Sequence, residues 1–180
     1  EAESRFFPLI SNDAKLRFAN GAIDAIAGFA ERKTGAHVLD TVIRHELADG
    51  TGHADLKVSE LRFGDSFQPD QLTYLAKGVV ANVQGSVVGD GRIDWSSAGV
   101  TSRGTFATSN SDLAAAFGPV KGATTTLVFD DLLSLRSAPN QKIRLAEVNP
   151  GIPVLDGEIE YQLLGDNRVR IQGGSWPFAG

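Results

Sequence analysis

The chain of 180 residues contains no cysteine and no methionine, and only two tryptophans and two tyrosines. Without cysteine there is no disulfide framework, no thiolate metal site and no cysteine nucleophile. The sequence also lacks a signal peptide and any apolar run near the roughly 18 residues that a membrane-spanning helix needs. The chain starts at Glu1 without methionine. We therefore expect it to be a fragment of a longer protein, with any membrane anchor outside these residues.

Basic charge is also scarce. The 17 Lys and Arg residues are outnumbered by 22 Asp and Glu residues, so the net charge is −5. Nucleic acids and anionic membrane surfaces bind basic patches, so neither is expected as the main partner. The three histidines, His37, His45 and His53, are too far apart along extended chain to bind one metal ion. The sequence predicts no metal and no cofactor.

Motifs for catalysis are equally rare. No G-x-S-x-G turn is present, and Gly89-Asp90-Gly91 lacks the third glycine and the following helix of a phosphate-binding loop. The adjacent carboxylates Asp130 and Asp131 would point to opposite sides of a strand, so they are poorly placed to act together. We predict that the chain is not an enzyme, and a carboxylate-dependent hydrolase is the third-ranked function.

The clearest pattern lies in Val79–Trp95, where odd positions are apolar or glycine and most even positions are polar. This period of two predicts a strand with one face in an apolar environment and one in water. A two-residue turn at Gly89-Asp90-Gly91 would shift the apolar residues to the other parity, and no shift occurs. The stretch is therefore either one strand of about 17 residues, roughly 56 Å long, or a hairpin with an odd loop.

Further strands are expected on both sides of this stretch. Lys15–Ala19 precedes the turn dipeptide Asn20-Gly21, and the following Ile23–Phe29 is a strand or, alternatively, a helix. Short helices are predicted at residues 69–75 and 111–118, from a helix-start proline and from a Ser N-cap with a Gly C-cap. The total is about nine strands and two short helices, mainly antiparallel β.

The last hairpin also has two distinct faces. Its apolar face contains Leu155, Gly157, Ile159, Tyr161 and Leu163, and a short turn then pairs Leu163 with Val169 and Tyr161 with Ile171. Two short helices cannot cover about nine strands. A second sheet covers the apolar face, or the sheet curls on itself, or the face is open to a ligand. Patterning alone favours a closed core over an open groove.

Residues 67–180 resemble the YdbH family of bacterial envelope proteins, whereas residues 1–66 match it only loosely, as a strand meander. The likeness is carried, in family order, by Gln68-Pro69-Asp70-Gln71-Leu72, Gly91-Arg92-Ile93-Asp94-Trp95, Phe117-Gly118-Pro119-Val120, Val128-Phe129-Asp130-Asp131-Leu132-Leu133, Ala138-Pro139-Asn140-Gln141, Asn149-Pro150-Gly151-Ile152-Pro153-Val154 and Trp176-Pro177-Phe178-Ala179-Gly180.

The resemblance implies membership of the AsmA-like group, which is related to TamB. These proteins are anchored in the inner membrane of Gram-negative bacteria and extend across the periplasm. A long antiparallel sheet, bent into a U-shaped trough, would carry phospholipid between the inner and outer membranes. An outer-membrane or periplasmic protein would be a further partner. The residues expected to line the trough and contact acyl chains are Val79, Ala81, Val83, Val87, Ile93, Trp95, Leu155, Ile159, Tyr161 and Leu163.

The resemblance also gives the glycines of Val79–Trp95 a role as points where the sheet bends or the lining thins. Aspartate at Val83 or Ile93 is expected to block lipid transfer without unfolding the protein. The alternative function is a non-catalytic β-sandwich that spaces or docks envelope proteins, which would have a dry, fully packed interior.

Overall fold

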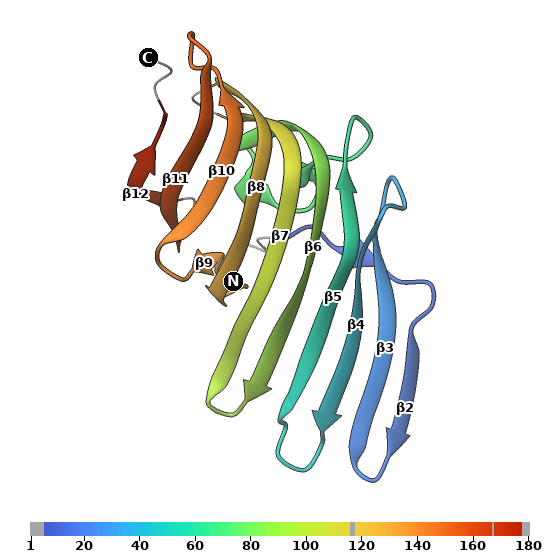
Figure 1. Cartoon of the computed structure of the whole chain (residues 1–180). Coiled ribbons are helices and arrows are strands. Elements are labelled where there is room, and N and C mark those ends of the chain that lie inside the picture. Colours follow the sequence, from blue (N-terminus) through green and yellow to red (C-terminus); the bar gives the residue numbers. More distant parts are fainter. Residues whose placement is uncertain (1–5, 116–117, 167, 178–180) are drawn as a thin grey trace.

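The computed structural model describes residues 6–115, 118–166 and 168–177. They form one twelve-stranded antiparallel sheet in the order β1-β3-β4-β5-β6-β7-β8-β10-β11-β12, with β2 on β3 and β9 between β8 and β11. The strands lie side by side and bend along their length (Figure 1). Their bounds are β1 Leu9–Ile10, β2 Lys15–Ala19, β3 Ala22–Glu31, β4 His37–Glu46, β5 Gly52–Phe63, β6 Val80–Ser96, β7 Gly99–Ala115, β8 Gly118–Asp131, β9 Arg136–Ser137, β10 Gln141–Val148, β11 Val154–Gly165 and β12 Arg168–Ser175.

The long predicted strand is confirmed as β6, which has 17 residues. Its register with β7 is continuous from Val87 to Ser96, so Gly89-Asp90-Gly91 lies in mid-strand and the hairpin alternative is wrong. The turn at Asn20-Gly21 is also confirmed, with φ angles of 52° and 77° that match a hairpin turn. The residues after this turn form β3, so the helix alternative there is wrong.

Both predicted helices are wrong. Residues 69–75 contain only three-residue 3₁₀ turns, η1 (Pro69–Gln71) and η2 (Tyr74–Ala76). Residues 111–115 extend β7 and pair with β8, because strand pairing overrides the helix preference of alanine; Ala116 and Phe117 lie outside the described residues. A search of the described ranges for a helix with the length and hydrophobicity of a bilayer span found none.

The hydrophobic core is small for a chain of this length. The accessible surface is 11124 Å², whereas a compact protein of this mass exposes about 8,400 Å². Two separate clusters of buried side chains form the core, one around Val58 and Phe67 and one around Val120 and Leu145. The excess surface, roughly a third, follows from a sheet that is mostly one layer thick.

Candidate functional site

One side of the sheet forms a broad apolar face. Because directly paired residues point to the same side, the register traces this face across the strands. One row of paired residues crosses the six strands from β2 to β7. A second row lies two residues further along each strand, nearer the hairpin turns that join β2 to β3, β4 to β5 and β6 to β7. The first row is Leu16, Ala25, Ile43, Ala54, Ile93 and Ser102, and the second is Phe18, Ile23, His45, Gly52, Trp95 and Val100.

Part of the apolar face is covered by the chain itself. The segment between β5 and β6, which lies behind the sheet in Figure 1, places Phe67 on Val58 and Leu61. The Phe67 ring stacks on Phe63 with a centroid distance of 5.6 Å. Near the other edge, Trp176 packs against the cluster around Leu145. These contacts bury the ends of the strands that lie near the β5–β6 connection.

The opposite end of the apolar face is uncovered. Leu16, Phe18 and Val100 are 70%, 64% and 60% exposed. At the C-terminal edge, Val169 and Ile171 of β12 are also exposed. Monomeric soluble proteins rarely expose apolar patches of this extent unless the patch binds something. The uncovered end is therefore the leading candidate for a functional surface.

Aromatic rings lie flat on glycines within the apolar face. A Cβ atom on Gly52 would overlap Trp95, and one on Gly89 would overlap Phe106. The indole Nε1–H of Trp95 donates a hydrogen bond of 3.1 Å to His45 Nδ1, which fixes the ring across three strands. The glycines therefore thin the lining to seat aromatic rings.

Of the three glycines in Val79–Trp95 that were expected to bend the sheet or thin its lining, Gly85 lies at an irregularity of β6. Gly89 and Gly91 do not carry a left-handed φ and the ladder runs through them. The register shifts lie between Ala81 and Val87, where Asn82 and Gly85 have φ angles of 51° and 156°. A bulge locally bends a strand and increases its twist.

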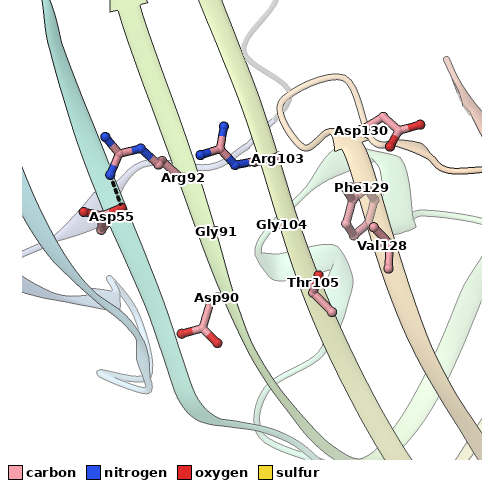
Figure 2. Close-up of a pocket in the computed structure, with 10 residues that line it drawn as sticks. All are labelled: Asp55, Asp90, Gly91, Arg92, Arg103, Gly104, Thr105, Val128, Phe129 and Asp130. Atoms are coloured by element: carbon pink, nitrogen blue, oxygen red, sulfur yellow. Dashed lines mark hydrogen bonds and ion pairs between the residues drawn. The ribbon is translucent and has the colours of Figure 1, made fainter.

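The opposite side of the sheet is mostly polar, although Ile26 and Val42 are exposed there, and it carries ion pairs between strands. Figure 2 shows a shallow depression on this side, around Gly91 and Gly104. Arg92 lies 2.8 Å from Asp55 and 2.9 Å from Asp94. Hydrogen bonds to these two carboxylates raise the pKa of Arg92 above its ordinary value, and the bond to Asp94 has the larger effect. Charges satisfied by their neighbours are typical of a solvated sheet face.

Two of the predicted lining residues lie on this polar side. Leu155 pairs with Glu147 and is 56% exposed, because the left-handed φ of Asp156 (53°) turns it away from Gly157 and Ile159, although the register with β10 is unshifted. Ala81 is turned away in the same manner, since the irregularity at Asn82 makes Val80 the partner of Ala115 on the apolar face. The alternation in the sequence could not reveal either change of side.

Seven of the predicted residues share the apolar face: Val83, Val87, Ile93, Trp95, Ile159, Tyr161 and Leu163. Among them Val83 is only 9% exposed, and its backbone N–H and C=O are hydrogen-bonded to the Gln68 side chain. Burial raises the pKa of Tyr161, whose hydroxyl lies 3.5 Å from Thr125 Oγ1. The face also includes side chains that the sequence analysis did not select as site residues, chiefly Leu16, Phe18 and Ile43, although their strands alternated visibly.

Val79 precedes β6, yet it lines one cavity together with Leu163 and Val169. Three strands, β7, β8 and β10, lie between β6 and β11 in the sheet, so in a flat sheet β6 and β11 would be about 19 Å apart. Their approach shows that the sheet and the β5–β6 segment curve toward one another on the apolar side.

The carboxylates considered for catalysis do not converge. Asp131 accepts hydrogen bonds from the Ser102 hydroxyl and the Ser134 amide, whereas Asp130 lines the polar depression. In the part of the chain that the structure describes, no three His, Asp or Glu side chains are placed to hold a metal ion.

Comparison with known proteins agrees with the resemblance and extends it. The model of the YdbH-like family, described as intermembrane phospholipid transport protein YdbH, matches residues 2–180. No curated protein and no solved structure matches the chain significantly. The match covers the later strands and also those of the first 66 residues, which the sequence motifs matched only loosely. The chain therefore belongs to the YdbH-like family of intermembrane phospholipid transport proteins.

Proposed function

We propose that this chain is a segment of a bridge-like carrier in the periplasm, along which phospholipid moves between the inner and outer membranes. The observation that carries the proposal is the uncovered end of the apolar face, where Leu16, Phe18 and Val100 are exposed to solvent. An anchor outside these residues would hold the carrier in the inner membrane. Residues 1–66 and 67–180 would act as one unit, because their strands belong to one sheet.

The two sides of the sheet suit the two parts of a phospholipid. Each methylene removed from water on the apolar face contributes about 0.8 kcal/mol, so ten methylenes contribute up to about 8 kcal/mol without specific contacts. The ion pairs of the polar side, such as Lys57–Asp90 at 3.0 Å, keep that side in water. In this proposal the protein moves a lipid and forms or breaks no covalent bond, so no reacting side chain is needed.

The curvature of the sheet supports a trough. Val79, just before β6, lines one cavity with Leu163 and Val169 of β11 and β12, and the two core clusters lie on the apolar side. The alternative, a β-sandwich that docks envelope proteins, requires two packed layers. The described residues form one sheet, so the alternative is less well supported. A protein partner at the outer membrane or in the periplasm remains part of the proposal.

A pair of valines on adjacent strands provides the test. Val100→Asp places a charge on the apolar face, and Val88→Asp places the same charge on the polar side, where Val88 is 44% exposed. Native mass spectrometry of purified protein is expected to detect bound phospholipid in the wild type and in Val88→Asp. Val100→Asp is expected to retain at least tenfold less, since an acyl chain cannot cover an unpaired carboxylate without desolvating it.

Both positions are exposed, so thermal unfolding should be similar in the two variants. Val83→Asp is less suitable, because Val83 is buried and a charge there would unfold the segment. Equal lipid retention by Val100→Asp and Val88→Asp, or a wild type that never carries lipid, would overturn the proposal.

A further inference from the structure

The turn between β11 and β12 separates two adjoining depressions of opposite character. On the apolar side, a cavity of about 140 Å³ is lined by Val79, Leu135, Leu163 and Val169. Asp166 and Arg168 also line this cavity, at its edge toward the polar side, and its aliphatic part is large enough for a small apolar group. On the polar side, a depression of about 490 Å³ is lined by Arg136 and other polar groups. Leu163, Gly165, Asp166 and Arg168 line both depressions, so one ligand can occupy both.

Two arginines flank this shared rim. Arg136 of β9 pairs with Leu164, and Arg168 of β12 pairs with Gly165, the next residue along β11. The aliphatic part of Arg136 lies over Gly165, where a Cβ would come within 3.2 Å of Arg136 Cγ. Gly165 has a φ of 78°, a conformation that glycine adopts without strain. The glycine therefore leaves room for the stem of Arg136, and both arginines line the polar depression.

One carboxylate lies beside each arginine. Asp166 lies 3.7 Å from Arg168, and both side chains are about two-thirds exposed, so this ion pair is weak. Asp131 of the neighbouring strand β8 pairs in register with Arg136 and interacts with its charge, although its carboxylate also accepts hydrogen bonds from Ser102 and Ser134. A bound phosphate therefore competes with Asp131 and Asp166 for the two arginines.

We propose that Arg136 and Arg168 bind the phosphate of a glycerophospholipid whose acyl chain enters the cavity formed by Val79, Leu163 and Val169. This inference rests on the proposed function and names the ligand group recognised at one point of the apolar face. Arginine suits the task, because its planar guanidinium pairs with two phosphate oxygens at once. The apolar cavity beside the arginines selects a lipid phosphate over free phosphate.

Binding of two short-chain probes to the purified chain tests the inference. Dihexanoyl phosphatidylglycerol carries a phosphate, and dihexanoylglycerol has the same acyl chains without it. The wild type should bind the phospholipid at least tenfold more tightly, because charge-assisted hydrogen bonds are lost with the phosphate. The double variant Arg136→Gln/Arg168→Gln should lose that preference and still bind dihexanoylglycerol as the wild type does.

Two single variants serve as matched controls. Arg170→Gln removes an arginine from the same strand, opposite Gln162 and outside both depressions, and should leave both affinities unchanged. Asp166→Asn removes one competing carboxylate at a position where asparagine tolerates the φ of 51°, and should tighten phospholipid binding severalfold. All four side chains changed are exposed, so thermal unfolding should not change.

The outcomes separate this inference from the proposed function. If the double variant binds both probes as the wild type does, the arginine site is overturned and lipid binding by the apolar face stands. If inorganic phosphate binds the wild type as tightly as the phospholipid does, the assignment to a lipid is overturned. If neither probe binds the wild type, the proposed function and this inference both fail.

Discussion

Gln68 provides a direct test of how the β5–β6 segment is fastened to the apolar face. Its side-chain oxygen accepts a hydrogen bond of 2.8 Å from the Val83 amide. Its side-chain nitrogen donates to the carbonyl oxygens of Val83 and Gly64, at 2.9 and 2.8 Å. One side chain thus takes the place of a neighbouring strand where β5 has ended. Gln68→Ala removes all three bonds at a partly buried site.

At about 1 kcal/mol for each bond, Gln68→Ala is expected to lower the free energy of unfolding by about 3 kcal/mol. The measurement is urea-induced unfolding, with hydrogen exchange at the Val83 amide as a local probe. Gln84→Ala is the matched control, because Gln84 donates a single exposed hydrogen bond to Asp65, and it should cost less than about 0.5 kcal/mol. Equal stabilities for the two variants, with unchanged exchange at Val83, would refute the reasoning.

Two further predictions test the register and the pH response. Leu155→Thr should change the free energy of unfolding by less than about 0.5 kcal/mol, because Leu155 is on the polar side, whereas Ile159→Thr should lower it by about 2 kcal/mol or more. Similar losses in urea-induced unfolding would contradict the change of side at Asp156. Glu31 accepts hydrogen bonds from the Lys33 and Thr34 amides, which lower the pKa of its carboxyl group in the folded protein. The stabilisation by these bonds is therefore present above the ordinary pKa of glutamate and is lost as the pH falls through the pKa of Glu31 in the folded protein. Glu31→Gln should flatten the pH dependence of unfolding below about pH 5, and an unaltered profile would argue against this contribution.

Much of the fold could be predicted from the period of two and from turn residues. The length of β6, the turn at Asn20-Gly21 and the pairing of Leu163 with Val169 and of Tyr161 with Ile171 all agree with the structure. These features depend on local alternation and turn chemistry, which the sequence displays directly. The helix predictions failed because cap residues and alanines are weak signals against strand pairing in a large sheet.

The candidate site was predicted less completely. Alternation identified Ile93 and Ile159, yet it assigned Leu155 and Ala81 to the wrong side, since each lies beside a residue with positive φ, and at Ala81 the register also shifts. Such an irregularity changes parity without leaving a pattern that could be counted in advance. Arg136 and Arg168 are 32 positions apart, and only the approach of β9 to the β11–β12 turn places them at one rim.

The sequence by itself determined that this protein is a β-sheet with one apolar and one polar side, because side chains alternate along every strand. The family motifs connected that sheet with lipid. Only the tertiary structure decided which part of the apolar side is covered, since coverage depends on where the β5–β6 segment and Trp176 fold back. The same composition could have formed a closed core or an open face. Gln68 and the curvature of the sheet decide between them, and both act through contacts between residues distant in the chain.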